Sequence, residues 1–335
     1  MFDPTPHSLS FHGGRLDEAA RRFRDAPVPW LDLSTGINPG AWQAPAGIAA
    51  DLRALPSGSD LKALNGAAAG MMGADHVAVA ALPGSEIGLR LVAQLGLPRP
   101  WRIVGPGYRT HAAALPGAEA IGADAVLAEG ARGGTLLLAN PNNPDGRLWQ
   151  PRALLALARA LAAAGGVLVI DEAFADAVPD ASILPLLSAD DRVLVFRSFG
   201  KFFGLAGVRL GFAFGAGDLV ASLGEMLGSW PVSATAIALG TAAYRDRPWI
   251  DATRARLRAD ADALDGLLAR HGLTAGGACP LFRLVETDEA PGVFERLARA
   301  GILTRPFDHA PRWLRFGLPG DAAERARLDR ALRHG

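Results

Sequence analysis

The chain has 335 residues, and its 34 acidic side chains balance its 34 basic ones, so the formal net charge is zero. Half of the residues are apolar, which suffices for a buried core and excludes intrinsic disorder. The balance also leaves no surplus of cations for binding nucleic acid, and Cys279, the only cysteine, can form neither an intramolecular disulfide nor a cysteine zinc site.

Neither the N-terminus nor the most apolar segment fits a targeting or membrane sequence. Residues 1–12 carry His and Asp where a signal peptide needs a basic start and an apolar stretch. Residues 153–170 are interrupted by Arg159 and by Gly165-Gly166, so they do not form the ~20-residue apolar span of a membrane helix. We therefore expect a soluble, cytoplasmic protein that binds neither nucleic acid nor membranes.

Short apolar runs alternate with helical patterns through the first two thirds of the chain. Runs that are apolar throughout are typical of strands in a parallel sheet that helices cover on both faces. We expect strands at 77–81, 101–104, 135–139, 167–170, 193–196 and 208–214, with helices at 85–95 and 151–164. The predicted class is α/β, with a mostly parallel sheet flanked by helices in a large domain, residues 41–239.

After about residue 236 the pattern changes to longer helices and scattered short strands. We expect helices at 251–271 and 291–300, strands at 282–286, 302–306 and 313–318, and a helix at the C-terminus. With residues 1–40, residues 240–335 would form a smaller α+β domain.

Polar residues follow several predicted strands, at the edge of a parallel sheet where ligands bind. After strand 77–81, Gly84, Ser85 and Glu86 present backbone N–H groups at the start of a helix, an arrangement that suits a phosphate. Taken alone, this loop reads more simply as an N-cap by Ser85. It lacks the spacing of a Walker loop or a nucleophile elbow.

Two further strands end in polar residues. Strand 135–139 runs into a turn rich in side-chain amides that includes Asn143, which by itself is ordinary turn chemistry. Strand 167–170 ends at Asp171, whose carboxylate can either face a cationic nitrogen in a cleft or serve as a charge at a helix N-terminus.

Lysine is rare in this chain: of the 34 basic residues, only Lys62 and Lys201 are lysines. Lys201 lies in an apolar, glycine-rich segment after strand 193–196, whereas Lys62 lies in a polar region beside Asp60. Desolvation can deprotonate a lysine amine and let it form a Schiff base, which an arginine cannot do. Lys201 is therefore the candidate nucleophile.

In their order along the chain, these segments resemble the fold-type-I pyridoxal-phosphate enzymes, the aspartate aminotransferase superfamily. The resemblance implies that Lys201 carries the cofactor and that Asp171 pairs with its pyridinium nitrogen, so that the ring accepts electrons. It implies a catalytic and ring-stacking role for Tyr108, in the motif PGY. The other implied cofactor ligands are Gly84, Ser85, Glu86, Asn143, Ser198 and Arg209.

Two motifs narrow the resemblance. The N-terminal HGG at 12–14 and LDLSTGINPG at 31–40 are similar to the threonine-phosphate decarboxylases of cobalamin biosynthesis, relatives of histidinol-phosphate aminotransferase. Phe174 stands where the aminotransferases usually have a tyrosine. In the motif WLRFGLP, Arg315 matches the arginine that holds a substrate carboxylate. The resemblance implies decarboxylation of a phosphorylated amino acid, and a homodimer.

The sequence departs from the family in two places. Leu55-Pro56 replaces a Tyr-Pro pair that reaches the partner subunit's cofactor, and Pro319 stands where a second arginine often lies. Recognition of the substrate phosphate is therefore open. The candidates for that role are His12, Asn38, Arg305 and Arg312.

Three other functions compete with decarboxylation. An aminotransferase would use Lys201 to remove the Cα proton. A non-catalytic, cofactor-sensing domain would usually accompany a DNA-binding module, for which there is no room before residue 30. A dinucleotide-binding enzyme would need Gly-x-Gly-x-x-Gly after its first strand, and GPGYRT at 105–110 supplies only two of those glycines. No metal site is expected.

Overall fold

The computed structural model describes residues 8–48 and 50–333. The chain divides into two compact units, a large unit of Ala41–Asn143 and Arg147–Arg254 and a small unit of Met1–Gly40, Pro144–Gly146 and Ala255–Gly335. The boundary between Arg254 and Ala255 lies inside one continuous helix, α10 (Arg247–Arg270). The sequence pattern places this boundary near residue 240. A helix that continues through a division shows no change of period there.

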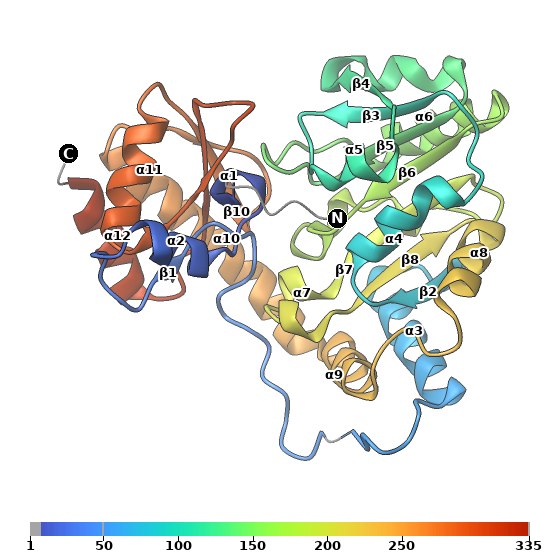
Figure 1. The fold of residues 1–335 in the computed structure, drawn as a ribbon. Coiled ribbons are helices and arrows are strands. Elements are labelled where there is room, and N and C mark those ends of the chain that lie inside the picture. Colours follow the sequence, from blue (N-terminus) through green and yellow to red (C-terminus); the bar gives the residue numbers. More distant parts are fainter. Residues whose placement is uncertain (1–7, 49, 334–335) are drawn as a thin grey trace. The chain divides into compact units, whose positions relative to one another are not determined.

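The large unit is built on a seven-stranded sheet with the strand order β2-β8-β7-β6-β5-β3-β4 (Figure 1). The strands are β2 (Ala78–Leu82), β3 (Trp101–Gly105), β4 (Glu119–Gly122), β5 (Thr135–Ala139), β6 (Val167–Asp171), β7 (Val193–Ser198) and β8 (Gly211–Gly215). All neighbouring pairs are parallel except the two that β8 makes. The predicted α/β class with a mostly parallel sheet is confirmed.

Helices cover both faces of this sheet (Figure 1). The helices of the large unit are α3 (Gly58–Met72), α4 (Ser85–Leu91), α5 (Thr110–Ala114), α6 (Pro151–Ala163), α7 (Phe199–Phe202), α8 (Gly217–Leu227) and α9 (Ala234–Arg245). On one face, Leu89 of α4 and Leu223 of α8 join Val169 in the core. On the other face, the Tyr244 ring of α9 contacts Phe212. Burial on both faces explains why the strands are apolar throughout.

The small unit is α+β, as predicted. Its strands form a two-stranded sheet, β1-β11, and a four-stranded antiparallel sheet with the order β12-β13-β10-β9. The strands are β1 (Leu31–Asp32), β9 (Ala275–Gly276), β10 (Phe282–Glu286), β11 (Ile302–Leu303), β12 (Arg305–Pro306) and β13 (Trp313–Gly317). Its other helices are α1 (Ser8–Phe11), α2 (Leu16–Arg22), α11 (Ala290–Arg299) and α12 (Ala322–Arg333).

The clearest differences from the predicted elements concern two strands and one helix. The strand expected at 208–214 begins only at Gly211, because a 3-10 turn, η6 (Ala206–Val208), precedes it and Arg209 has a left-handed backbone with φ 55°. The strand expected at 302–306 is divided into β11 and β12. The helix expected at 85–95 ends at Leu91 and continues as a 3-10 turn, η1 (Val92–Gln94).

Within the described ranges, no helix has the length and apolar character needed to span a bilayer. The same residues contain no group of His, Cys, Asp or Glu side chains that could bind a metal ion.

Candidate active site

The pairing register aligns the ends of several strands at one edge of the large sheet. Ala139 of β5 lies beside Asp171 of β6, and Asp171 lies beside Phe196 of β7. At the antiparallel pairs, Gly211 of β8 lies between Ser198 of β7 and the last residue of β2. The loops that follow β2, β5, β6 and β7 therefore share the edge where α/β sheets bind ligands.

Asp171 is buried at this edge and held by two hydrogen bonds. Its Oδ2 shares a hydrogen bond of 3.0 Å with Nε2 of His111, and its Oδ1 accepts the N–H of Ala173 at 3.0 Å. His111 lies in α5 and is itself buried, with its ring packed edge-on against Tyr108 at 5.8 Å between centroids. The two bonds fix the orientation of the carboxylate. His111 is not among the predicted site residues, and its only signal in the sequence is its place three residues after Tyr108.

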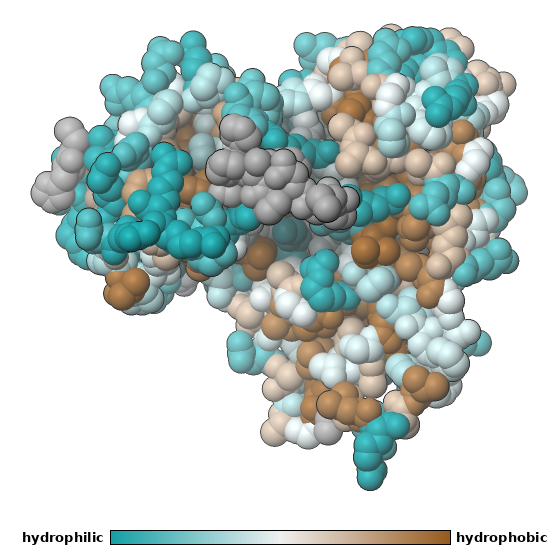
Figure 2. Space-filling view, in the orientation of Figure 1, coloured by the Kyte–Doolittle hydropathy of each residue, from teal (hydrophilic) through white to brown (hydrophobic). Residues whose placement is uncertain are grey.

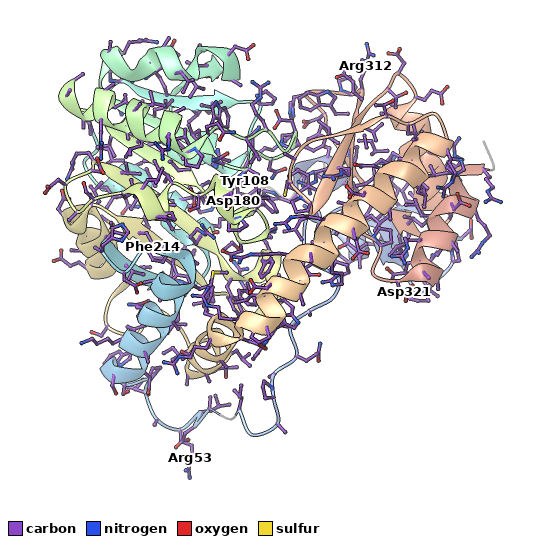
Figure 3. All side chains as sticks on the ribbon, turned by 180° about the vertical axis from the view of Figure 1, so that it is seen from behind. Arg53, Tyr108, Asp180, Phe214, Arg312 and Asp321 are labelled. Carbon is purple, nitrogen blue, oxygen red and sulfur yellow. The ribbon has the colours of Figure 1, made fainter. Side chains whose placement is uncertain are left out.

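The carboxylate of Glu86 fixes Tyr108. The Tyr108 hydroxyl donates to Oε2 of Glu86 at 3.3 Å, and the Thr110 hydroxyl donates to Oε1 at 3.5 Å. Burial, supported by the negative charge of Glu86, raises the pKa of Tyr108 to about 12. Tyr108, labelled in Figure 3, therefore keeps its proton at neutral pH. The sequence predicts a role only for the backbone of Glu86, whereas in the structure its side chain also accepts hydrogen bonds from Tyr108 and Thr110.

The loop after β2 approaches the guanidinium of Arg209 closely. Gly84 has φ 90°, and a Cβ added to it would lie 2.7 Å from Nη2 of Arg209. A Cβ on Gly211 would lie 2.4 Å from the backbone nitrogen of Ser85. A side chain at Gly84 would fill the space between the loop and Arg209, and one at Gly211 would push against the backbone of the loop. Backbone amides and a guanidinium facing one another form a cradle suited to a phosphate.

Lys201 lies in α7, directly after the end of β7. Its side chain is half-buried, and its Nζ lies 5.8 Å from the centroid of the buried Phe174 ring. Phe174 follows Asp171 by three residues, so the contact places the amine near the end of β6. Ser198 is the residue before α7.

Asn143 is half-buried in the turn after β5. Its neighbour Asn142 donates through Nδ2 to the Pro106 carbonyl at 2.9 Å, which ties this turn to the loop that carries Tyr108. Asn143, Tyr108 and Asp171 thus lie at or just after the ends of β5, β3 and β6, three neighbouring parallel strands of the large sheet.

These residues fit pyridoxal phosphate. The cradle at Gly84 and Arg209 matches the phosphate, and a Cβ at Gly84 would close it. The buried carboxylate of Asp171, held by an imidazole and a backbone amide, matches a protonated ring nitrogen. Lys201 supplies the primary amine that an aldehyde needs.

Two arginines predicted to bind the substrate face each other in the small unit. Arg305 of β12 and Arg315 of β13 are directly opposite in register, and they are only 7% and 4% exposed. Nη2 of Arg315 donates to the Ser34 carbonyl at 2.7 Å, and burial lowers the pKa of Arg315 to about 10. Opposite residues share a face of the sheet, and like charges there repel. A bound anion would offset this repulsion.

The HGG motif packs against the segment that holds Arg315. A Cβ on Gly13 would lie 2.2 Å from the Ser34 carbonyl oxygen, and the N–H of Gly14 donates to the Ser34 hydroxyl at 2.7 Å. His12 is half-buried at the start of this contact. The two motifs that carried the family resemblance are therefore adjacent in space.

The two remaining candidates have different surroundings. Asn38 is buried, and its Oδ1 accepts from the Gly40 N–H at 2.9 Å and from Nη2 of Arg256 at 2.8 Å, so it shapes a turn. Arg312 is exposed at the surface, where its Nε lies 3.2 Å from Oδ1 of Asp288 (Figure 3). The structure does not place Arg312 among the buried arginines.

Residues 119–333 match the family model for aminotransferase class I and II, and the chain belongs to that family. It is similar to two proteins named threonine-phosphate decarboxylase, over nearly the whole length of each. One, from Sinorhizobium sp, is 42% identical over 329 residues, which cover 96% of this chain and 97% of the relative. The other, from Pseudomonas aeruginosa, is 41% identical over 325 residues, 96% of each.

Similarity to the aminotransferases of the family is lower. Histidinol-phosphate aminotransferase 1 from Cupriavidus pinatubonensis is 30% identical over 318 residues, covering 78% of this chain and 84% of the relative. Among solved structures, histidinol-phosphate aminotransferase from Sinorhizobium meliloti, in complex with pyridoxal-5'-phosphate, has a TM-score of 0.80 at 22% identity. That match covers 99% of this chain and 98% of the other, and it supports the fold.

Proposed function

We propose that this protein decarboxylates L-threonine O-3-phosphate to aminopropanol phosphate in cobalamin biosynthesis, with pyridoxal phosphate as its cofactor. One observation carries the proposal: the identity of 41–42% to two threonine-phosphate decarboxylases extends over nearly the whole chain. The histidinol-phosphate aminotransferase relative is only 30% identical, over 78% of this chain.

When bound, pyridoxal phosphate supplies an aldehyde for the substrate amine and a protonated ring that accepts the electron pair of the bond broken at Cα. The amine of Lys201 would hold the cofactor in the absence of substrate, and once free it would deliver a proton to Cα. Asp171, oriented by His111 and the Ala173 N–H, holds the proton on the ring nitrogen. Tyr108 would contribute an aromatic surface for the cofactor ring.

Other residues of the large unit anchor the cofactor. Asn143 would donate its amide to the ring hydroxyl of the cofactor. Gly84, Ser85, Glu86, Ser198 and Arg209 would bind the cofactor phosphate. Phe174 provides an apolar surface near Lys201, where the aminotransferases carry a tyrosine hydroxyl.

Arg305 and Arg315 provide the charge that this substrate requires. Threonine phosphate carries two anionic groups, a carboxylate and a phosphate, and the two buried guanidinium groups lie opposite each other on one ladder. Arg315 binds the carboxylate of the substrate. Arg305 binds the phosphate together with His12, the first residue of the HGG motif. Fixing both groups decides which Cα substituent is held for cleavage.

The test uses purified holoenzyme and carboxyl-labelled threonine phosphate without any 2-oxo acid. We expect labelled carbon dioxide and aminopropanol phosphate in equal amounts. Serine phosphate in the same assay measures the contribution of the substrate methyl group. A requirement for 2-oxoglutarate, with amino transfer and no gas, would instead identify an aminotransferase and overturn the proposal.

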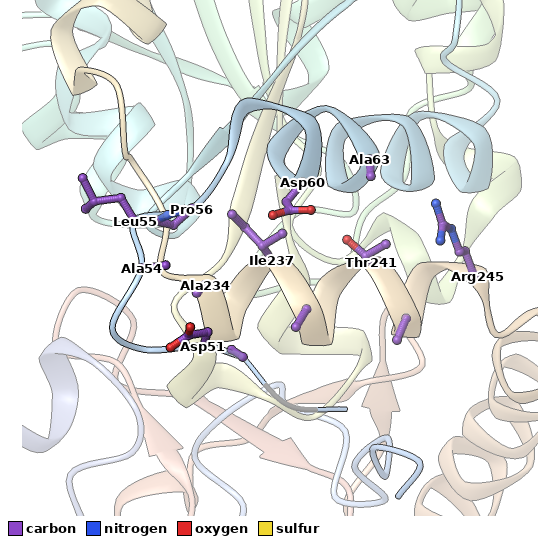
Figure 4. A pocket seen from close by; sticks show the side chains of 13 residues that line it. Asp51, Ala54, Leu55, Pro56, Asp60, Ala63, Ala234, Ile237, Thr241 and Arg245 are labelled. Atoms are coloured by element: carbon purple, nitrogen blue, oxygen red, sulfur yellow. The ribbon is translucent and has the colours of Figure 1, made fainter. Parts of the chain in front are cut away.

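We also propose that the protein is a homodimer. Leu52 and Leu55 are 77% and 67% exposed in the segment before α3, beside a pocket of about 490 Å³. Figure 4 shows Leu55 and Pro56 at one end of this pocket, which α3 and α9 line with mostly apolar side chains including Ile237. Figure 2 shows hydrophobic side chains at the surface over the same helices. A second copy of the chain would cover them.

A further inference from the structure

A buried ion pair joins the ends of β6 and β7. Glu172 directly follows Asp171, and Arg197 directly precedes Ser198. The side chains of Glu172 and Arg197 are both buried. Nη1 of Arg197 donates to Oε2 of Glu172 at 2.8 Å, and Nη2 of Arg197 donates to Oδ1 of Asp176. The pair therefore links the two strands whose ends carry predicted cofactor ligands.

The carboxylate of Glu172 accepts hydrogen bonds from three donors. Besides Arg197, the Ser182 hydroxyl donates to its Oε2 at 2.6 Å and the Ile183 N–H donates to its Oε1 at 2.9 Å. Burial raises the pKa of Glu172, and the positive charge of Arg197 opposes that effect. Replacing a buried ion pair by apolar residues of similar volume often leaves stability unchanged or raises it. The position of this pair between the two strands is therefore a better indication of its role than its contribution to stability.

The ion pair lies on the sheet face opposite to the candidate site. The backbone N–H of Glu172 donates to the Phe196 carbonyl at 2.8 Å, so the pairing of β6 with β7 continues through Glu172. Successive residues of a strand point to opposite faces. Asp171 and Ser198 therefore share one face, while Glu172 and Arg197 share the other.

We propose that Glu172 and Arg197 are positioning residues that set the separation between Asp171 and α7, and thereby the place of Lys201 relative to Asp171. They act through the backbone, since each is the chain neighbour of a residue at the site and neither side chain shares the face of Asp171. This inference rests on the proposed roles of Asp171 and Lys201 in binding the cofactor.

The large unit contains a matched control. Arg102 of β3 and Glu129 form a second buried arginine–glutamate pair in the same unit. Neither has a chain neighbour that is assigned to the site. A purely structural contribution from a buried ion pair would therefore be common to both pairs, whereas positioning of the cofactor residues would be particular to Glu172 and Arg197.

The experiment compares Glu172→Gln with Glu129→Gln. Each apoprotein is titrated with pyridoxal phosphate, following visible absorption, and the pH at which the bound cofactor's band changes is recorded. We expect both variants to unfold at lower temperature, because each removes the charge of a buried carboxylate that pairs with a buried arginine. Only Glu172→Gln should raise the Kd for pyridoxal phosphate, by about tenfold or more, and move the pH midpoint of the band.

Equal Kd values and equal pH midpoints for the two variants would overturn the inference. If Glu172→Gln does not fold, Ser182→Ala replaces it and Ser188→Ala becomes its control, since the Ser188 hydroxyl donates to the Asp191 carboxylate near the start of β7. Ser182→Ala should then raise the Kd at least about threefold above Ser188→Ala, and no difference refutes the inference. The titration contains no substrate, so an error in the proposed reaction would leave its outcome unaffected.

Discussion

At the scale of single residues, some side chains of the candidate site can be predicted from the sequence and others cannot. Lys201 was visible because lysine is so rare in this chain, and Asp171 because it ends an apolar strand. His111 and Glu172 were not recognised, because their roles depend on which strands and helices pack together. No local pattern marks the contact of His111 with a carboxylate 60 residues later in the chain.

The choice of Lys201 over Lys62 can be tested directly. Reduction of the holoprotein with borohydride should fix pyridoxal phosphate to Lys201, as read by peptide mass spectrometry. Lys201→Ala removes the amine and should abolish this label, whereas Lys62→Ala should keep it because Lys62 is an exposed residue of α3. A label on Lys62, or one that persists in Lys201→Ala, would contradict the assignment.

The two tyrosines of the chain predict an alkaline limit to stability. Burial raises the pKa of Tyr108 to about 12 and that of Tyr244 well above its usual value. The unfolded chain loses these protons near pH 10, before the folded chain does, so stability should fall as the pH rises above about 10. Below that value both states keep the protons, and the tyrosines contribute no pH dependence.

Absorbance of the apoprotein at ~295 nm, where tyrosinate absorbs, measures this difference. We expect little tyrosine ionisation in the folded protein up to about pH 11, and titration of both tyrosines near pH 10 in concentrated urea. Tyr108→Phe separates the two contributions. A folded-state titration near pH 10 that disappears in Tyr108→Phe would show that Glu86 and burial do not protect this phenol.

At the scale of elements, agreement with the sequence depends on where the signal lies. The strands expected at 135–139 and 282–286 are β5 and β10 to the residue. Strand β4 was not expected, because its sequence EAIG has no apolar run and becomes a strand by pairing with β3. Helix α3 was also missed: its many glycines and alanines carry little periodicity, and it depends on the cap at Ser57 and on packing against α9.

Helix α7 provides a test of how closely Lys201 must be placed. A Cβ on Gly200 would lie 2.6 Å from the Cα of Ala206, a backbone atom that cannot move aside alone. Gly200→Ala should therefore displace α7 from η6, lower the free energy of unfolding by about 1–3 kcal/mol and weaken cofactor binding. Urea unfolding and cofactor titration measure the two effects.

Gly207→Ala is the control for this substitution. No atom lies within 4 Å of a Cβ added at Gly207, and its backbone is not left-handed. The control should leave cofactor binding unchanged and alter stability by less than about 1 kcal/mol, in the stabilising direction. If Gly200→Ala behaves like Gly207→Ala, α7 tolerates displacement and the packing argument fails.

At the scale of the whole molecule, both units are discontinuous in sequence. The small unit takes residues from the N-terminal segment, from Pro144–Gly146 and from Ala255–Gly335. A local change of pattern can indicate that a second domain exists, but not that a three-residue turn belongs to it. The Ala278 N–H donates to the Gly146 carbonyl at 3.0 Å. These two residues are 132 positions apart, and no local sequence pattern predicts their contact.

The proposed homodimer gives a prediction at this scale. Light scattering of the purified protein should give twice the chain mass of 34.9 kDa. Leu52→Glu with Leu55→Glu should produce monomer, because two carboxylates would have to be buried in the interface at a cost that apolar contacts cannot offset. Leu127→Glu is the control, since that leucine is 55% exposed but lies elsewhere, in the 3-10 helix η2 (Ala123–Arg132). A wild-type monomer, or a double variant that stays dimeric like the control, would show that the segment around Leu55 is not the contact between copies.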